Sequence, residues 1–267
     1  MNNKIRNKFI NLLLLEIKKF NNTKTDKRGR HTIKYSNKYI LNIIIDKFIL
    51  GISWRQTKDI KINDKNVSYS TIYYRYNQLV KNNIIINAYE NLLKDYCIKI
   101  DNSCAYIDTT SIINKYGYKK HTSFNNYVLR KHRTCKLSII SSKNGIPLGI
   151  TISNTLTHDI KLLLNTLPQK PLFNKLCGDK GYINQDFKNK LLKTKGIQLI
   201  SPYRTNQTSL NSLEDTKLLK GRYIVEHLNN FIKQNKQIQT RYIKKDTTFL
   251  SYIYLAFIKR ALEIFLS

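Results

Sequence analysis

The fold of this chain is decided by the stretch CKLSIISSKNGIPLGITIS, residues 135–153. Two apolar or alternating runs, residues 135–141 and 146–153, flank the polar segment SKNG at residues 142–145. Asn-Gly between β-prone runs is a strong signal for a tight hairpin. We therefore expect two antiparallel strands here, and a β-sheet in the second half of the chain.

Strand-like and helix-like patterns alternate around this hairpin. Short apolar runs bounded by turn residues predict strands over 104–109, 175–178 and 198–202. Apolar residues at helical spacing predict helices over 159–167, 187–195 and about 216–234. This order of elements predicts an α/β domain over residues 99–267, in which helices pack on the faces of a mixed sheet.

Residues 1–98 have a different character, because their patterns are helical and basic. They predict helices over 4–20, over 37–50 between the caps Ser36 and Gly51, and over 71–82 after the cap Ser70. In the last of these helices, the polar side chains expected to face outward are Arg75, Asn77, Gln78 and Lys81. Such side chains can pair with base edges in the major groove of DNA, but an ordinary surface helix of a three-helix bundle has the same pattern.

Basic residues far outnumber acidic ones. Lys and Arg total 47 and Asp and Glu total 17, so the formal net charge is +30. A compact domain with this excess repels itself unless a polyanion neutralises it, which favours DNA, RNA or an anionic membrane as partner. No basic amphipathic helix stands out and no apolar run is long enough to span a bilayer, so we expect nucleic acid. An AT-rich genome would also enrich a protein in Lys, Asn, Ile and Tyr, and this explanation stays open.

The cysteines give no sign of a zinc site or a disulfide framework. Cys97, Cys104, Cys135 and Cys177 form no C-x-x-C pair, and His132 with Cys135 has no second pair to complete a metal site. We expect reduced and mostly buried thiols. The N-terminus has no secretory signal, so we expect an intracellular protein.

Three carboxylates stand out in a chain with so few acids. Asp108 and Asp179 each follow a predicted strand, at the end where α/β proteins gather their ligands. Glu226 shares one polar stripe of its predicted helix with Arg222 and Lys233, at about 100° per residue. These residues suit a carboxylate metal site flanked by cations that hold phosphates. Turn-capping aspartates and a solvated helix face with an ion pair between Arg222 and Glu226 would give the same pattern.

Several short segments resemble the DDE transposases of bacterial insertion sequences, and among them the IS-five-like branch. The segments that carry the resemblance are AYIDTT at 105–110, GDKGY at 178–182 and RYIVE at 222–226. THD at 157–159 resembles the family's recurring His-Asp pair, and its R-x3-E-x6-K pattern is matched by Arg222, Glu226 and Lys233. SWR at 53–55, with the helix over 71–82, resembles the family's N-terminal DNA-binding segment.

The resemblance implies a ribonuclease H-like fold, preceded over residues 1–98 by an all-helical, helix-turn-helix-like DNA-binding domain. It implies DNA cleavage at the element's ends and attack of the released 3′-OH on a target strand, with two Mg²⁺ or Mn²⁺ ions held by Asp108, Asp179 and Glu226. The residues implied to hold DNA phosphates are Arg222, Lys233 and Lys180, and those implied to support the site are His158 and Asp159. The implied partners are double-stranded DNA, as element ends and as target, and a second copy of the chain in a homodimer on DNA.

Two other functions stay open. A DNA-binding protein derived from a transposase would keep the helical domain and lose catalysis. A ribonuclease H-like nuclease would cut DNA without joining it. All three proteins would act on DNA inside a cell, in the cytoplasm of a prokaryote or in a nucleus or viral factory.

Overall fold

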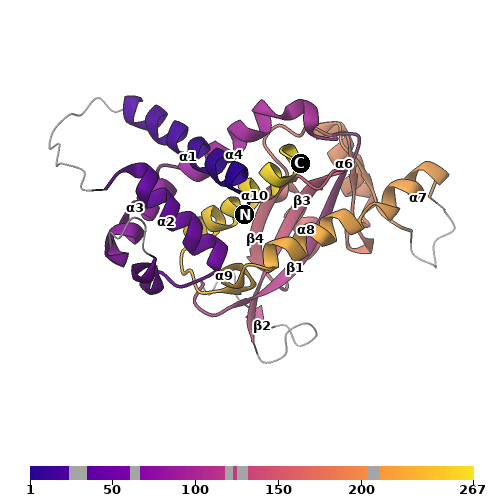
Figure 1. Cartoon of the computed structure of the whole chain (residues 1–267). Coiled ribbons are helices and arrows are strands. Elements are labelled where there is room, and N and C mark those ends of the chain that lie inside the picture. Colours follow the sequence, from indigo (N-terminus) through magenta and orange to yellow (C-terminus); the bar gives the residue numbers. More distant parts are fainter. Residues whose placement is uncertain (24–34, 61–66, 118–122, 125–131, 204–210) are drawn as a thin grey trace. The chain divides into compact units, whose positions relative to one another are not determined.

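A computed structural model describes residues 1–23, 35–60, 67–117, 123–124, 132–203 and 211–267 of the chain (Figure 1). The chain divides into two compact units. A helical unit contains Met1–Cys97, Asn235–Ile238 and Lys245–Ser267, and an α/β unit contains Ile98–Gln234 and Gln239–Lys244. In the described ranges, no helix combines the length and the apolar character that crossing a membrane requires.

The helical unit is organised around an apolar C-terminal helix. Its elements are α1 (Asn3–Thr23), α2 (Asn37–Leu50), the 3-10 helix η1 (Arg55–Asp59), α3 (Tyr69–Lys81), α4 (Ile84–Asp95), most of the short α9 (Lys236–Gln239), and α10 (Asp246–Phe265). A helix that is apolar around most of its circumference must be surrounded by other elements. Helix α10 meets this condition, since its buried residues include Phe249, Tyr252, Ile253, Phe257 and Leu262. The Tyr76 hydroxyl of α3 donates to the Thr248 carbonyl of α10 at 3.1 Å.

Local capping sets the bounds of α2 and α3. Ser36 accepts a backbone hydrogen bond at the start of α2, and Gly51 ends the helix at a φ of +62°, so both predicted caps are confirmed. The predicted cap of α3 is wrong, because Ser68 rather than Ser70 accepts the capping hydrogen bond. Two serines that lie two residues apart both suit an N-cap, and the sequence alone does not choose between them.

The last helix does not belong with the sheet that precedes it in the sequence. The structure separates the two units between Cys97 and Ile98, and it returns residues 245–267 to the helical unit. The sequence predicts instead that these residues belong to the domain over 99–267. The difference arises because the apolar surface of α10 packs against α1 and α4. The functional division into a DNA-binding domain over 1–98 and a catalytic domain over 99–267 stays a prediction.

The α/β unit is a mixed sheet flanked by helices. Its strands are β1 (Ala105–Asn114), β2 (Ser123–Phe124), β3 (Arg133–Ser142), β4 (Pro147–Asn154), β5 (Lys175–Cys177), β6 (Gln198–Ile200) and β7 (Thr240–Arg241). β4, β3 and β1 are antiparallel neighbours, β1, β5 and β6 are parallel neighbours, β2 pairs with β3, and β7 pairs with β1. Its helices are α5 (Asp159–Thr166), the 3-10 helix η4 (Lys180–Tyr182), α6 (Gln185–Lys195), α7 (Leu213–Lys220) and α8 (Tyr223–Lys233), and the 3-10 helix η2 (Cys97–Lys99) leads into the unit. This architecture, with the N-terminal helical region before it, confirms the predicted fold class.

The predicted hairpin forms between β3 and β4. The Ser142 N–H donates to the Ile146 carbonyl at 2.8 Å, and Gly145 turns the chain at a φ of +82°. β3 lies between β1 and β4, and its residues Leu137, Ile139 and Ile140 are fully buried. The hairpin therefore supplies the centre of the antiparallel half of the sheet.

The predicted helix over 216–234 is broken into α7 and α8 at Gly221. A Cβ atom at Gly221 would lie 2.1 Å from the hydroxyl oxygen of Tyr106, so the Tyr106 side chain reaches directly to the backbone there. The N–H groups of Gly221 and Arg222 donate three residues back, as in a tight 3-10 turn. Because of this break, α8 is a separate helix that packs against β1 and β3.

Gly149 in β4 lies where the end of α5 packs closely on the sheet. A Cβ atom there would lie 2.0 Å from the carbonyl oxygen of Thr166, and a backbone atom cannot swing away. Gly149→Ala should therefore lower the free energy of unfolding by more than about 2 kcal/mol, as measured by urea denaturation. Gly196→Ala is the control, since its Cβ would meet nothing within 4 Å and its cost is about 1 kcal/mol of strain at positive φ. Equal costs for the two variants would contradict this packing.

Candidate functional site

Parallel strand pairing brings two of the predicted carboxylates to one edge of the sheet. The register between β1 and β5 pairs Tyr106 with Cys177. Asp108 follows Tyr106 by two residues, and Asp179 follows Cys177 by two residues. The two aspartates therefore occupy matching positions just beyond the paired segment, on strands that are about 4.8 Å apart.

The predicted position of Asp108 at the end of a strand is wrong. β1 continues past Asp108 to Asn114. It does so because β3 keeps pairing with it as far as Ile113, whereas β5 stops at Cys177. Asp108 thus projects from a continuous strand, at the point where the parallel neighbour ends.

Helix α8 packs on one face of β1 (Figure 1). The contact of its Asn229 with Asp108 places Asp108 on this face. Successive side chains of a strand alternate between its faces, so Asp108 and Thr110 share a face. The side-chain amide of Asn229 donates to Asp108 Oδ2 at 2.8 Å, and Lys233 Nζ donates to Thr110 Oγ1 at 2.9 Å. Glu226 lies one turn before Asn229 on the same helix, with 54% of its side chain exposed. The polar stripe of α8 therefore runs along the Asp108 face of the strand.

Burial and neighbouring charges together raise the pKa of Asp108. Burial is the largest cause that raises the pKa of this carboxyl group, to about 6, and the negative charges of Asp179 and Glu226 act in the same direction. The Thr109 N–H and the guanidinium of Arg222 oppose the rise in pKa. Arg222 is also 3.7 Å from Glu226, measured from Nη2 to Oε1. The predicted carboxylates and the predicted arginine therefore share one electrostatic environment.

The turn after β5 passes between two carboxylates. Asp179 begins η4, and its Oδ1 accepts a hydrogen bond from the Gly181 N–H at 2.8 Å. A Cβ atom at Gly181 would lie 3.0 Å from Asp179 Oδ1 and 3.2 Å from Asp159 Oδ2. A larger residue would push these carboxylates aside, which explains glycine in the GDKGY segment. Lys180 is exposed on the same turn.

Asp159, predicted to support the site, is tied to the sheet. Its Oδ1 accepts hydrogen bonds from Lys136 Nζ at 2.7 Å and from Thr109 Oγ1 at 3.1 Å. Thr109 faces the opposite side of β1 from Asp108, so Asp159 braces the strand from the other face. His158 is exposed and makes no capping hydrogen bond at the start of α5. Of the predicted His-Asp pair, Asp159 thus contacts the sheet and His158 is exposed to solvent.

The oxygen atoms at this edge of the sheet suit a hard divalent cation. Carboxylates give Mg²⁺ or Mn²⁺ both affinity and charge neutralisation, and a cation would relieve the negative charge of the half-buried Asp108. Asn229 adds an amide oxygen that is buried and has no hydrogen-bond partner in the described part of the chain. Within the same described residues, no three His, Cys, Asp or Glu side chains are grouped closely enough to hold one ion. The donor set fits such an ion, and shared binding requires the carboxylates to come closer together.

The predicted DNA-reading residues of α3 differ in exposure. Lys81 is exposed, whereas Arg75, Asn77 and Gln78 are half-buried. The guanidinium of Arg75 donates to the side-chain oxygen of Asn37 in α2, so it helps to hold α2 and α3 together. The reading of base edges by this helix stays a prediction.

Two residues that contact the carboxylates, Asn229 and Lys136, were not predicted from the sequence. Asn229 lies three residues after Glu226 and four before Lys233, a spacing that places all three on one side of a helix, so a signal was present. Lys136 gave no such signal, because its partner Asp159 lies on another element 23 residues away. Both residues act through the carboxylates they contact.

Comparison with known proteins points to one family. The family model described as Transposase DDE domain matches residues 99–244, which is more than half of the 267 residues. The matched range contains Asp108, Asp179, Glu226 and Lys233. No curated protein is a significant match to the sequence.

Distant similarity extends to solved transposase structures. The cryo-EM structure of a piggyBac transposase synaptic complex with hairpin DNA is 8% identical, with a TM-score of 0.44, over 96% of this chain and 72% of that chain. The crystal structure of a pre-cleavage Mos1 transpososome is 10% identical, with a TM-score of 0.26, over 92% of this chain and 84% of that chain. A Mos1 transposase paired-end complex with the left transposon end is 10% identical, with a TM-score of 0.30, over 90% and 82% of the two chains. These similarities are too distant to indicate a function, which the family match supports instead.

The raised pKa of Asp108 predicts that its charge costs stability when no metal is bound. The folded chain retains the Asp108 proton up to about pH 6, whereas an unfolded aspartate loses it near about pH 3.9. The cost therefore grows between these values and is complete above pH 6. Asp108→Asn should raise the free energy of unfolding at pH 8 in EDTA by on the order of 1–3 kcal/mol, and the gain should fade towards pH 4. Chemical denaturation at the two pH values measures both effects.

Added Mg²⁺ shows whether the gain in stability of Asp108→Asn comes from the lost charge or from a change in side-chain packing. It should stabilise the wild type more than Asp108→Asn, because a cation relieves only a charged carboxylate. Asp186→Asn, at an exposed carboxylate of α6, is the matched control and should alter neither result. A loss of stability in Asp108→Asn at pH 8 would show that the charge of Asp108 is already compensated.

Proposed function

The chain belongs to the transposase DDE family, and from this we propose that it cleaves DNA at the ends of a mobile element and joins the released 3′-OH to a target strand. Transposases of this family generally use divalent metal ions. The observation that carries the proposal is that Asp179 and Glu226, from two other elements, lie near enough to the half-buried carboxyl group of Asp108 to raise its pKa. A carboxyl group whose pKa is raised by burial and by neighbouring negative charges is a candidate for metal binding and catalysis.

The proposed ligands for two Mg²⁺ or Mn²⁺ ions are Asp108, which would contact both, and Asp179 and Glu226, which would each complete one. Bound ions supply activation of the attacking water or 3′-OH and stabilisation of the leaving oxygen in an in-line displacement. Asn229 holds Asp108 Oδ2 through its amide, so the carboxylate is oriented before DNA arrives. The hydrogen bond from Thr109 to Asp159 holds the opposite face of the same strand.

Basic side chains beside the carboxylates are the proposed phosphate contacts. The ammonium of Lys233 lies on the Asp108 face of β1, where a DNA phosphate can replace Thr110 as its acceptor. Arg222 is too far from Glu226 for a strong hydrogen bond, so its guanidinium can still bind a phosphate with two parallel donors. Lys180, on the turn after Asp179, offers a third cation.

The proposed substrate is double-stranded DNA, as element ends and as target. The net charge of +30 supports a polyanionic partner. In this proposal the helical unit holds the duplex, with the polar residues of α3 at the base edges, while the α/β unit carries out the chemistry. Cleavage of two ends by two copies of the chain would make the active form a homodimer on DNA.

Cleavage and joining of DNA that carries the element's own ends test the proposal. Wild type with Mg²⁺ or Mn²⁺ should give both cut and joined products. Asp108→Ala and Glu226→Gln should each lower the yield of both products by more than about 100-fold, because each removes a ligand. Asp186→Ala, at an exposed acid of the same unit, should retain full yield.

The products also distinguish the competing functions. Tight DNA binding without cutting in either metal would overturn the catalytic proposal and favour a transposase-derived DNA-binding protein. Metal-dependent cutting without joined product would favour a ribonuclease H-like nuclease. Full activity of Asp108→Ala would exclude the proposed ligand set.

The charge excess predicts steep salt dependence of DNA binding. If the chain neutralises about 6–10 phosphates, its affinity for duplex DNA should fall roughly 10³- to 10⁵-fold between about 50 and 200 mM salt. Fluorescence anisotropy of a labelled duplex measures this slope. An affinity that does not change with salt would mean that the excess charge reflects residue composition rather than DNA binding.

A further inference from the structure

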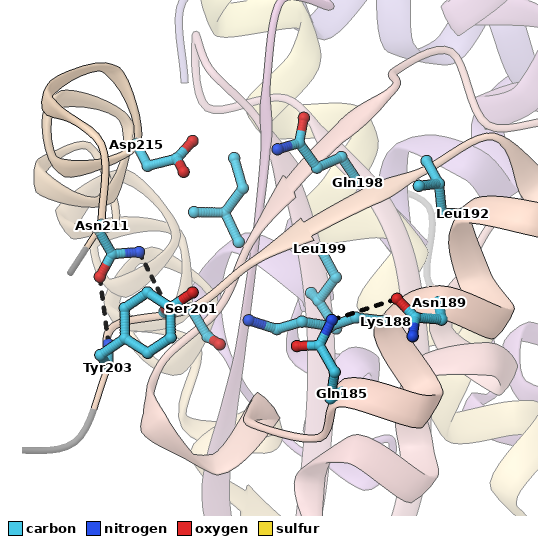
Figure 2. Close-up of a pocket in the computed structure, with 11 residues that line it drawn as sticks. Gln185, Lys188, Asn189, Leu192, Gln198, Leu199, Ser201, Tyr203, Asn211 and Asp215 are labelled. Carbon is cyan, nitrogen blue, oxygen red and sulfur yellow. Dashed lines mark hydrogen bonds between the residues drawn. The ribbon is translucent and has the colours of Figure 1, made fainter. Parts of the chain in front are cut away.

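A pocket of about 210 Å³ lies against β6, the last strand on one side of the described sheet. Figure 2 shows residues of α6 on one side of this pocket and Ser201, Tyr203, Asn211 and Asp215 on the other. Leu199 and Ile200 of the strand contribute to its lining. The carboxylate site uses none of these residues, so the pocket is a separate feature of the α/β unit.

Ser201 is the residue that points to a ligand. It lines the pocket, it is only 2% exposed, and its Oγ has no hydrogen-bond partner among the described residues. A buried hydroxyl group without a partner is costly, and a polar group bound in the pocket would satisfy it. The lining of the pocket therefore contains an unmet hydrogen bond.

Asn211 holds two residues of the pocket lining, Ser201 and Tyr203, in place. Its side-chain amide donates to the Ser201 carbonyl at 3.2 Å, and its side-chain oxygen accepts from the Tyr203 N–H at 3.2 Å (Figure 2). The positions of Ser201 and Tyr203 relative to each other are therefore fixed before any ligand binds. A site whose groups are positioned in advance loses less free energy on binding.

The remaining lining suits a flat ring with polar edges. Gln185, Asn189 and Gln198 can each donate and accept hydrogen bonds, as the edges of a nucleobase do. Tyr203 is 38% exposed and offers an aromatic face, and Lys188 Nζ lies 5.9 Å from the centre of that ring. The volume is below the roughly 300–1,000 Å³ of pockets for drug-sized ligands, so it fits one ring system rather than a whole nucleotide cofactor.

The pocket opens near the edge of the sheet that carries the carboxylates. β5 and β6 pair in parallel with Cys177 opposite Ile200, and the Gly178 N–H donates to the Ile200 carbonyl at 2.9 Å. Asp179 and Ser201 therefore follow neighbouring strands at the same edge, and such strands are about 4.8 Å apart. A DNA strand bound at Asp179 would therefore pass close to the pocket.

We propose that this pocket binds a single nucleobase that has left the duplex beside the cleaved phosphate, stacked on Tyr203 with its polar edge on Ser201 and the amide side chains. The proposal rests on the proposed cleavage of DNA and adds a contact to a base rather than to the backbone. Holding an extruded base offsets the cost of unstacking it, and so makes the adjacent phosphate accessible. Lys188, beside the Tyr203 ring, is placed to neutralise the phosphate of the same nucleotide.

Binding of single-stranded DNA in EDTA tests the pocket without catalysis. The probes are a fluorescein-labelled oligonucleotide and a strand of the same length and charge whose sugars carry no bases. Wild type should prefer the strand with bases by roughly 5- to 100-fold, the range expected for stacking of one base on an aromatic ring. Tyr203→Leu should remove most of this preference and leave affinity for the strand without bases unchanged.

Tyr242→Leu is the matched control. Tyr242 is 42% exposed and has Lys115 Nζ at 5.4 Å from its ring, but it does not line the pocket. This variant should keep the full preference for bases. Gln198→Ala, at an exposed position of β6, provides a second test if Tyr203→Leu fails to fold, and should reduce the preference by roughly 2- to 10-fold.

Two results would overturn the pocket proposal. One is a wild type that binds both strands equally, and the other is a folded Tyr203→Leu that keeps the preference. Neither result bears on cleavage, which needs metal ions and is tested on duplex ends. Cutting and joining without base preference would refute the pocket alone, and base preference without cutting would refute the catalytic proposal alone.

Discussion

The parallel register between β1 and β5 is the constraint on which the candidate site depends. Pairing of Tyr106 with Cys177 sets Asp108 and Asp179 at matching positions. A slip of one residue would turn every side chain of a strand to its other face, and Asp108 would then point away from α8. The register is held by apolar packing rather than by the acids, through the buried cluster of Cys104, Tyr106, Cys177, Ile200 and Val225.

Tyr106 links this packing to the position of α8. Its side chain reaches the backbone at Gly221 and separates α7 from α8, so the second helix follows its own direction along β1. Only then can Asn229 reach Asp108 and Lys233 reach Thr110. The polar contacts of the site are therefore a consequence of one large buried side chain, and they carry little of the stability themselves.

Features that depend on neighbouring residues were predictable from the sequence, and those that depend on distant contacts were not. The hairpin and the caps at Ser36 and Gly51 follow from a few adjacent residues. The break at Gly221 needs the ring of Tyr106, and the extra length of β1 needs β3 as a partner. Among the site residues, the acids were identified by position and resemblance, but their burial and their hydrogen bonds could not be, because residues from separate elements create them.

The place of α10 in the helical unit sets an order of events during protein synthesis. The ribosome makes α1 to α4 first and α10 only after the whole α/β unit. The nascent helical unit therefore waits with an apolar surface uncovered, a state that chaperones recognise and that favours aggregation. A stop codon after residue 244 would spare every described strand and remove the centre of the helical core. Late truncations should thus disable the first part of the chain to be made.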